Sequence, residues 1–146
     1  MPRIDFRSPR LFVDAPLVTG ETLVPSREQA HYLVHVLRLD PGETVLVFNA
    51  RDGEWRARLD ANRRAPRLLI AERTRPREAL PDIRYVFAPI KHARLDYMVQ
   101  KAVELGARAL VPVLTRHTQV ARVNTGRMRA NVIEAAEQCR VLSLAE

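Results

Sequence analysis

The sequence is poor in cysteine and in glycine, and each shortage excludes a class of protein. Cys139 is the only cysteine among 146 residues, which excludes an internal disulfide framework, and we expect it to be a packed thiol at the end of a helix. Only five residues are glycine, and no GxGxxG or Walker sequence occurs. There is therefore little material for a loop that cradles a nucleotide phosphate.

Long apolar runs and aromatic residues are also scarce. No apolar run reaches the length of about 18 residues that a membrane span needs, and the N-terminal MPRIDFRSPR lacks the apolar core of a secretory signal. We therefore expect a cytoplasmic protein without a membrane span. Aromatic residues make up 5% of the chain, and Phe48 and Trp55 alternate with polar residues as core positions do. This pattern does not favour an aromatic platform for stacked bases.

The sequence is rich in arginine instead. The net charge is +7 and the pI is about 10.6, so a polyanionic partner is favoured over a small neutral one. All basic residues other than Lys91 and Lys101 are arginine, whose planar fork suits phosphate and base edges. A compositional bias of the genome would give the same imbalance. The charge favours nucleic acid but does not identify a site.

Residues 11–72 have the pattern of a small barrel of strands. Residues 40–43 (DPGE) are typical of a type II turn, and residues 49–53 are typical of a hairpin loop. The strand after that loop alternates polar and apolar residues, with Trp55 on the apolar side. The predicted strands are 11–13, 22–24, 44–48, 54–59 and 67–71, with one helix inserted at 26–38. This pattern predicts an α+β domain built on a mostly antiparallel barrel.

Beyond a polar linker at 73–81 that contains prolines, the periodicity changes. Strand and helix alternate, as in α/β proteins with a parallel sheet. The predicted elements are strands 84–90 and 109–114 and helices 94–106 and 126–139. Two parallel strands and two helices do not complete such a domain, and a further strand is expected after the second helix. We expect a truncated chain, or one that depends on a partner.

The predicted helix at 26–38 carries a basic stripe. Ser26 and Gln29 have the spacing of a capping box, and apolar residues at i, i+3, i+4 and i+7 define a core face. Four side chains fall on a neighbouring stripe: Arg27, His31, His35 and Arg38. Donors at this spacing suit a phosphate backbone, although a merely solvated helix face has the same pattern. A metal site at the two histidines would need Glu28 as a third ligand, and we expect none.

A second basic segment, residues 115–129, follows the last predicted strand. Its basic side chains are Arg116, His117, Arg122, Arg127 and Arg129. Thr125 is expected to cap the following helix, and cations beside that end oppose the helix dipole, which favours an anion bound across it. An exposed basic loop without a ligand is the alternative. No serine, threonine or cysteine has the sequence context of a catalytic triad.

The helix at 94–106 is strongly amphipathic. Leu95, Val99 and Val103 lie on its apolar face, and Gly106 is a natural C-terminal stop. The opposite face carries Gln100, Lys101 and Glu104, where Glu104 is positioned to pair with either of the other two. Periodicity alone predicts that this polar face is exposed to solvent.

Four stretches together resemble a known family. They are PRLFVDAPL (9–17), HYLVHVLRLDPGETVLVFNARDGEW (31–55), LDYMVQKAVELGARALVPVLTRH (95–117) and IEAAEQC (133–139). In this order and spacing they resemble the bacterial small-subunit ribosomal RNA uridine-N(3) methyltransferase family. The resemblance implies a PUA-like RNA-binding barrel at 1–72, the linker at 73–81, and the N-terminal part of a SPOUT-class, trefoil-knotted domain at 82–146.

The resemblance also implies an activity. The family transfers a methyl group from S-adenosylmethionine to a uridine ring nitrogen of small-subunit ribosomal RNA, as a cytoplasmic homodimer. The family's Gly-Pro-Glu-Gly-Gly cofactor segment has no counterpart here. Catalytic residues are therefore expected beyond Glu146, with no cofactor-binding and no metal-binding residue in this chain. The alternative is a non-catalytic RNA-binding module produced by truncation.

Arg10, His35 and Arg38 match motif positions of the family. Together with the residues found above, the predicted RNA-binding set is Arg10, Arg27, His31, His35, Arg38, Arg116 and Arg122. The resemblance also implies that Gln100, Lys101 and Glu104 shape an RNA-facing or dimer-facing edge of the catalytic domain rather than carry out the chemistry.

Overall fold

The computed structural model describes residues 5–118, 120 and 122–146, and for His92 only the backbone. Residues 1–4 of the predicted first domain, and 119 and 121 of the predicted basic segment, lie outside the described residues. The chain forms two compact units, Met1–Arg77 and Glu78–Glu146. The first is built on a mixed sheet and the second on parallel strands with helices.

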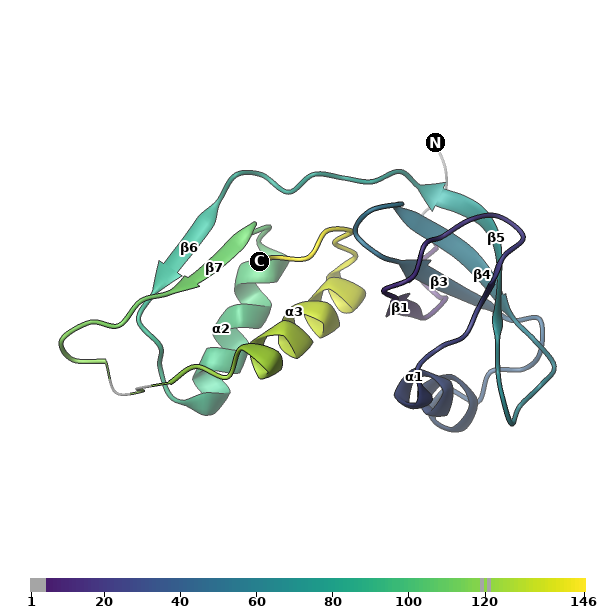
Figure 1. Ribbon diagram of the computed structural model, residues 1–146, viewed down its shortest axis with the longest axis horizontal. Coiled ribbons are helices and arrows are strands. Elements are labelled where there is room, and N and C mark those ends of the chain that lie inside the picture. Colours follow the sequence, from purple (N-terminus) through teal and green to yellow (C-terminus); the bar gives the residue numbers. More distant parts are fainter. Residues whose placement is uncertain (1–4, 119, 121) are drawn as a thin grey trace. The chain divides into compact units, whose positions relative to one another are not determined.

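The first unit contains a five-stranded sheet (Figure 1). Its strands, in chain order, are β1 (Arg10–Phe12), β2 (Thr22–Leu23), β3 (Thr44–Phe48), β4 (Glu54–Leu59) and β5 (Leu68–Arg75). In space the order is β1-β3-β4-β5-β2, with β1 and β3 parallel and the other neighbours antiparallel. The prediction of a mostly antiparallel sheet is confirmed, and β3 and β4 have the predicted bounds.

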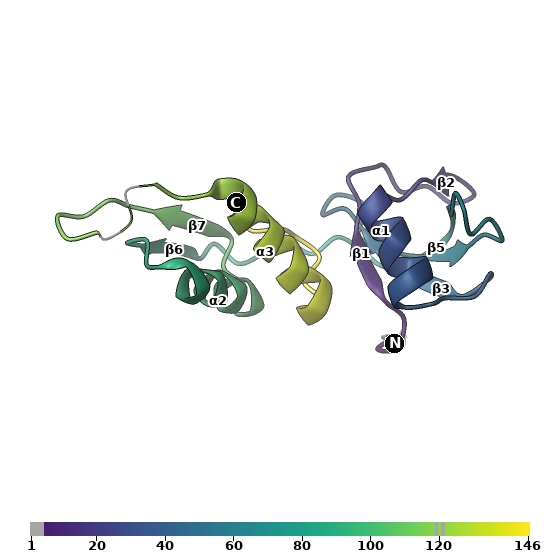
Figure 2. The ribbon, with the colours of Figure 1, turned by 90° about the horizontal axis from the view of Figure 1, so that it is seen from below.

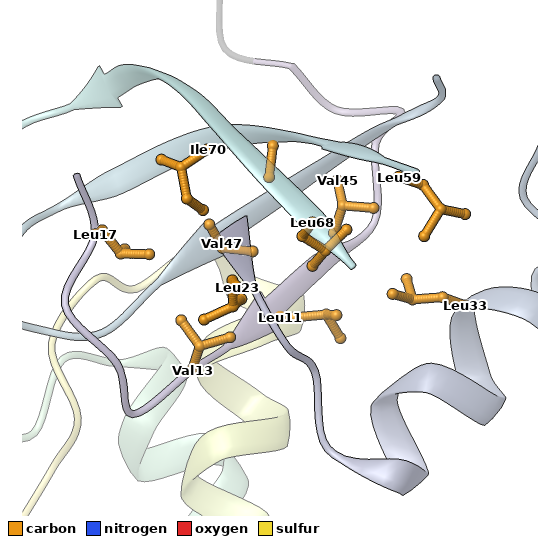
Figure 3. Packing of buried hydrophobic residues seen from close by; sticks show 11 residues of the cluster. Leu11, Val13, Leu17, Leu23, Leu33, Val45, Val47, Leu59, Leu68 and Ile70 are labelled. Atoms are coloured by element: carbon orange, nitrogen blue, oxygen red, sulfur yellow. The ribbon is translucent and has the colours of Figure 1, made fainter. Parts of the chain in front are cut away.

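The core of this unit comes from alternate residues of the strands (Figure 3). Because side chains alternate between the faces of a strand, Val45 and Val47 point inward together, and Ala57 and Leu59 do so from β4. Leu33 reaches the same cluster from the inserted helix and is 0% exposed. Trp55 and Phe48 are partly and fully buried, as the sequence predicts.

The inserted helix lies where the sequence predicts it, but its winding differs. A short α-helix, α1 (Arg27–His31), continues as a π-helix, η1 (Tyr32–Val36), in which Leu37 N–H donates to the Tyr32 carbonyl at 2.9 Å. The wider turn brings the adjacent residues Leu33 and Val34 into the core. The segment therefore does not follow the uniform 3.6 residues per turn on which its prediction as an α-helix is based.

Two turns of the first unit depend on left-handed backbone conformations. Gly42 has φ +86° in the predicted 40–43 turn, and Glu43 N–H donates to the Asp40 carbonyl at 3.1 Å. In the β3–β4 loop Gly53 has φ +85°, and a Cβ there would lie 2.2 Å from the Arg75 carbonyl oxygen. Only glycine allows β5 to approach so closely. Strand β5 accordingly continues to Arg75, into the segment predicted as a linker.

The second unit alternates strand and helix: β6 (Arg84–Phe87), α2 (His92–Glu104), β7 (Ala109–Pro112) and α3 (Thr125–Cys139). Strands β6 and β7 are parallel, and α2 packs against α3 (Figures 1 and 2). Helix α2 ends as predicted, because Gly106 with φ +86° allows Ala107 N–H to reach the Ala102 carbonyl at 2.9 Å.

Glu146 lies beside β7 on the edge away from β6. Its N–H donates to the Arg108 carbonyl at 2.9 Å, and its carbonyl accepts from Leu110 N–H at 2.7 Å. These two bonds flank Ala109 in the pattern of a parallel bridge. The further strand expected from the sequence stays a prediction.

Two expectations for α3 are wrong. Its N-cap is Asn124, whose Oδ1 accepts from Arg127 N–H at 3.0 Å, and not Thr125. Asparagine caps more strongly than threonine, so α3 begins one residue earlier than predicted. Cys139 is exposed rather than packed, because α3 ends there and Arg140 turns the chain in a left-handed conformation. Among the described residues, none of the helices combines the length and the apolar character required to cross a membrane.

Candidate nucleic-acid interface

The capping box of α1 fixes the position of the basic stripe. Ser26 Oγ accepts from Gln29 N–H at 3.2 Å, and Gln29 Oε1 accepts from Ser26 N–H at 3.0 Å, as predicted. Gln29 Nε2 also donates to the Phe12 carbonyl of β1 at 2.6 Å. Leu33 and Val34 anchor the inner side of the helix in the core. The outward side is thereby held in one orientation against the sheet.

That outward side carries three members of the predicted stripe, and the fourth, Arg38, follows the C-cap Leu37 in a left-handed conformation with φ +55°. Arg27, His31, His35 and Arg38 are all exposed, and the two imidazole rings lie 5.0 Å apart at an interplanar angle of 33°. Within residues 5–118, 120 and 122–146, Arg27 and Arg38 make no ion pair. In the same described part of the chain, no group of three or more His, Cys, Asp or Glu side chains is placed to hold a metal ion. The stripe is therefore available for an anionic partner.

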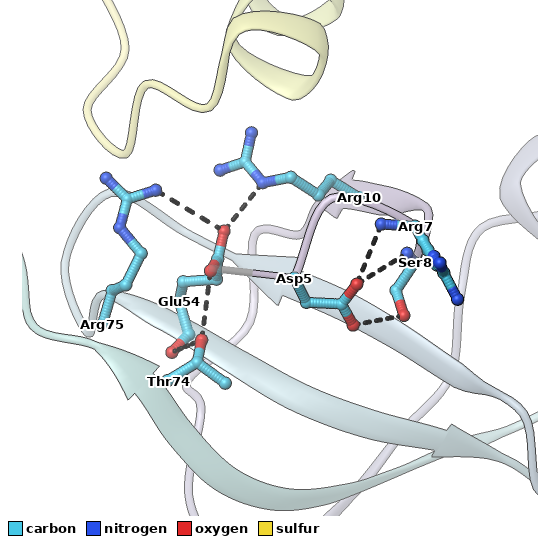
Figure 4. A network of polar contacts seen from close by, with 7 residues as sticks. All are labelled: Asp5, Arg7, Ser8, Arg10, Glu54, Thr74 and Arg75. Atoms are coloured by element: carbon cyan, nitrogen blue, oxygen red, sulfur yellow. Dashed lines mark hydrogen bonds and ion pairs between the residues drawn. The ribbon is translucent and has the colours of Figure 1, made fainter. Parts of the chain in front are cut away.

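Arg10 is a different case from the rest of the predicted RNA-binding set (Figure 4). It is 7% exposed, and its Nε donates to Glu54 Oε2 at 2.7 Å, while its guanidinium lies 4.4 Å from the centre of the Phe48 ring. Thr74 Oγ1 donates to the other carboxylate oxygen at 3.1 Å, and Arg75 approaches the first at 3.9 Å. Because this guanidinium is committed within the fold, we assign Arg10 to structure and not to RNA contact.

Sequence reasoning missed Glu54 as the partner of Arg10. Alternation along β4 placed it with the outward side chains, yet it is 2% exposed. The register of β4 against β5 shifts between Glu54 and Trp55 and again between Arg56 and Ala57. Such irregularities reorient single side chains, and a strict two-residue period cannot predict them.

The second unit has a hollow at the carboxyl ends of its parallel strands. Its volume is about 700 Å³, and its lining comes from the segments that follow β6 and β7. The lining residues are Ala88, Pro89, Ile90, Lys91, Arg94, Thr115, His117 and Thr118. Ligands of open α/β sheets bind at this edge. The sequence patterns predict His117 at a basic site but not Lys91 and Arg94, although the position of these two just after a predicted parallel strand is a usable signal.

Hydroxyl groups shape one side of this hollow. Thr115 N–H donates to Thr118 Oγ1 at 2.7 Å, the two hydroxyl oxygens lie 2.9 Å apart, and Thr118 N–H donates to the Thr115 carbonyl at 3.1 Å. The resulting turn presents Arg116 and His117 at the surface. Arg122, farther along the same segment, is exposed as well.

Arg127, by contrast, is engaged at the start of α3. Its Nε donates to Asp96 Oδ1 at 3.1 Å and its Nη2 to Asp96 Oδ2 at 2.5 Å, while Asn131 Nδ2 donates to Oδ1 at 2.8 Å. Hydrogen bonding to Asp96, and then its negative charge, raises the pKa of Arg127. The cation that was expected to attract an anion at this helix end thus already has a carboxylate.

Gln100, Lys101 and Glu104 do not form one site. Lys101 Nζ donates to Glu104 Oε2 at 2.8 Å, which raises the pKa of Lys101, and it lies 5.4 Å from the centre of the Tyr97 ring. Gln100 instead lines a hollow of about 370 Å³ between α2 and α3, together with Asp96 and Asn131. The edge role of these three residues remains a prediction.

Each unit contains a segment that is similar to a known domain family. Residues 77–146 match the RNA methyltransferase domain family, and residues 25–70 match the PUA domain of RNA methyltransferases. The ribosomal RNA small subunit methyltransferase E of Rickettsia conorii is 28% identical over 136 residues, which are 92% of this chain and 56% of that protein. The protein of the same name from Synechocystis is 30% identical over 88% of this chain and 43% of its own length. The chain thus spans about half the length of these relatives.

Solved structures agree with this assignment. A ribosomal RNA small subunit methyltransferase E from Neisseria gonorrhoeae, bound to S-adenosyl methionine, has a TM-score of 0.85 and 25% identity over 95% of this chain and 60% of that one. A putative methyltransferase from Legionella pneumophila, in complex with the same cofactor, has a TM-score of 0.82 and 25% identity, covering 96% of this chain and 61% of that one. Together these matches support a family of RNA methyltransferases with a PUA domain.

Proposed function

We infer, from the two matched domains, that this chain is similar to the ribosomal RNA small subunit methyltransferase E proteins, and we propose that it acts in methylation of small-subunit ribosomal RNA. In this proposal the first unit grips the RNA and the second is the N-terminal part of the methyltransferase domain. The reaction is transfer of a methyl group from S-adenosylmethionine to a uridine ring nitrogen, N3. The active form is a cytoplasmic homodimer.

The observation that carries the RNA-binding role is the exposed stripe of Arg27, His31, His35 and Arg38. Its two arginines have no carboxylate partner among the described residues. Helix α1, which carries Arg27, is tied to β1 by Gln29, and Arg38 follows the C-cap of η1 with φ +55°. Cations spaced along one helix face suit successive phosphates of an RNA strand. On the second unit, Arg116 and Arg122 are proposed as RNA contacts of their own.

The donor site is assigned to none of the described residues. S-adenosylmethionine supplies an activated methyl group on a positively charged sulfonium. The hollow that follows β6 and β7 does not fit that group, because Lys91 and Arg94 line it and no carboxylate does. What the chain itself contributes is RNA binding and orientation, which place the target base for transfer.

Salt-dependent RNA binding tests this proposal. Arg38→Ala should weaken binding of a fluorescein-labelled small-subunit ribosomal RNA helix, and should reduce the slope of log affinity against log salt by about 0.9. Arg63→Ala is the matched control, since Arg63 is an exposed arginine of the same unit that pairs with Asp40 at 2.8 Å. Fluorescence anisotropy measures both. An unchanged slope for Arg38→Ala would remove the stripe from the RNA interface.

A calorimetric titration with S-adenosylmethionine separates the donor site from the RNA site. We expect this chain to show no measurable heat of binding, as either the N-terminal part of a methyltransferase or a non-catalytic RNA-binding module would. Clear binding would contradict the absence of donor residues from this chain, and would favour a catalytic role for the chain by itself.

A further inference from the structure

The charged residues that line the hollow at the carboxyl ends of β6 and β7 are positive. Lys91 and Arg94 enter it from the start of α2, and His117 enters it from the turn after β7. Among the described residues, the remaining lining is apolar or carries a hydroxyl, and none of it is a carboxylate. A site of this composition attracts anions and repels cations.

Some other cations of this unit are paired with carboxylates. Arg84 and Arg108 both lie near Asp82, at 4.0 and 3.3 Å, while Lys101 and Arg127 each have a carboxylate of their own. In the part of the chain that the structure describes, Lys91 and Arg94 have no ion-pair partner. Arg116, Arg122 and Arg129 also make no ion pair among the described residues, so what sets Lys91 and Arg94 apart is that both line one hollow.

The position of these two cations is unfavourable for the fold itself. Lys91 is the N-cap of α2 and forms no side-chain cap, Arg94 follows in the first turn, and that turn contains no acidic residue. Positive charge at a helix N-terminus opposes the helix dipole, and like charges this close repel each other. A bound anion would relieve both effects.

We propose that this hollow is a phosphate-binding site for a single-stranded RNA segment, a second contact that deepens the proposed function and rests on it. Lys91 and Arg94 would pair with a phosphodiester, with His117 and Thr118 as hydrogen-bond donors to its oxygens. The apolar residues Pro89 and Ile90 offer a surface to the adjoining ribose or base. Recognition here is by phosphate and strand shape, without a base code.

Matched variants of the full chain test the site with a labelled dodecamer of uridine, r(U)12. Arg94→Ala and Lys91→Ala should each weaken binding about threefold to tenfold and reduce the salt slope by about 0.7. Arg94→Lys should retain most of the affinity. Arg84→Ala is the control, because Arg84 is 71% exposed in the same unit and lies beside Asp82. Equal binding by Arg94→Ala and Arg84→Ala would overturn the proposal.

Measuring r(U)12 binding by Arg38→Ala as well distinguishes the proposed contact at the hollow from the one at the stripe. A loss with Arg38→Ala but not with Arg94→Ala or Lys91→Ala rejects the hollow and leaves the stripe. A loss with the hollow variants alone rejects the stripe and leaves the hollow. If the unmodified chain binds the ribosomal RNA helix but not r(U)12, the hollow is rejected and the proposed function stands; if it binds neither RNA, the proposed function fails as well.

The ligand class is decided by nuclear magnetic resonance. Titration with the dinucleotide UpU should shift the amide signals of residues 88–94 and 115–118, whereas uridine, which lacks a phosphate, should not. Inorganic phosphate is the third probe. Saturation by inorganic phosphate at lower concentration than UpU would identify a site for free phosphate and overturn the RNA assignment, as would shifts of equal size with uridine.

Discussion

The two units hold an arginine and a carboxylate together in opposite surroundings. In the first unit Arg10 and Glu54 meet at 2.7 Å with 3% of each side chain exposed. In the second, Arg127 and Asp96 meet at 2.5 Å with 59% and 27% exposed. The distances are similar, but a desolvated pair depends on its partner far more than a solvated one does. The distance alone therefore does not show which of the two ion pairs matters more for stability.

The two units also differ in their apolar side chains. The first unit encloses a cluster of leucine, valine and isoleucine between its strands and its helix. The second leaves Tyr97 62% and Leu105 82% exposed, beside a largely apolar hollow of about 430 Å³ between β6 and α2. The first unit also exposes apolar side chains, with Val24 at 71% and Val36 at 58%, so the units differ in the hollow that borders the exposed apolar residues of the second and not in exposure as such.

The largest expected effect comes from removing the buried carboxylate. Glu54→Gln should lower the free energy of unfolding of the first unit by about 3 to 5 kcal/mol, because the Arg10 guanidinium would stay buried without a counter-charge. Urea unfolding followed by fluorescence measures this, since Trp55 is the only tryptophan and lies in this unit.

Glu72→Gln is the control for that change. Glu72 is 64% exposed and pairs with Arg56 on the same sheet, so its loss should cost less than about 1 kcal/mol. If the two variants lose equal stability, burial is not what distinguishes the Arg10–Glu54 tie from a surface pair.

A smaller effect is expected from the helix cap of the second unit. Asn124→Ala should cost about 1 kcal/mol, because Arg127 N–H loses its acceptor at the start of α3. A fluorophore on Cys139, the single exposed cysteine at the other end of α3, reports this unit. Thr125→Ala, one residue along, should change stability by less than about 0.5 kcal/mol.

The two reporters also test whether the units are independent. Asn124→Ala should shift the unfolding transition seen at Cys139 and leave the one seen at Trp55 in place. If both transitions shift together, the chain unfolds as one cooperative body and stability cannot be assigned to a single unit.

Local patterns predicted the elements well. The alternation around the 49–53 loop gave strands 44–48 and 54–59, and glycine placed the turn at 40–43 and the end of α2 at Gly106. Each of these features depends on neighbours within a few residues. The stripe on the inserted helix is of the same kind, because its members lie within about three turns of one another.

The features that sequence reasoning missed depend on distant parts of the chain. Glu54 is buried because Arg10, 44 residues away, meets it across the sheet. The hollow joins Lys91 to His117 only because β6 and β7 run parallel and end at the same edge. Asp96 of α2 accepts a hydrogen bond from Arg127 of the neighbouring helix α3. The periodic pattern of apolar residues along a single helix or strand does not predict these long-range contacts.

The smallest expected effect is a pH dependence confined to the first unit. Asn49 Nδ2 donates to Asp52 Oδ2 at 2.6 Å and Leu17 N–H donates at 3.0 Å, and these bonds lower the pKa of Asp52. A lowered folded-state pKa means that the unfolded chain binds the proton more readily. The stabilisation is therefore complete above the unfolded pKa of about 4 and is lost as the pH falls through the folded value.

Asp52→Asn removes this titration. The stability difference between the unmodified chain and Asp52→Asn, followed at Trp55, should shrink between about pH 6 and about pH 3. Trp55 is a suitable probe, since its Nε1 donates to the Asp52 carbonyl at 2.9 Å. Asp14→Asn, at an aspartate of the same unit whose side chain is 82% exposed, is the matched control for the substitution. A constant difference for Asp52→Asn would mean that the Asn49 and Leu17 bonds do not favour the charged carboxylate, and that the first unit gains its stability from the Arg10–Glu54 tie and the apolar core alone.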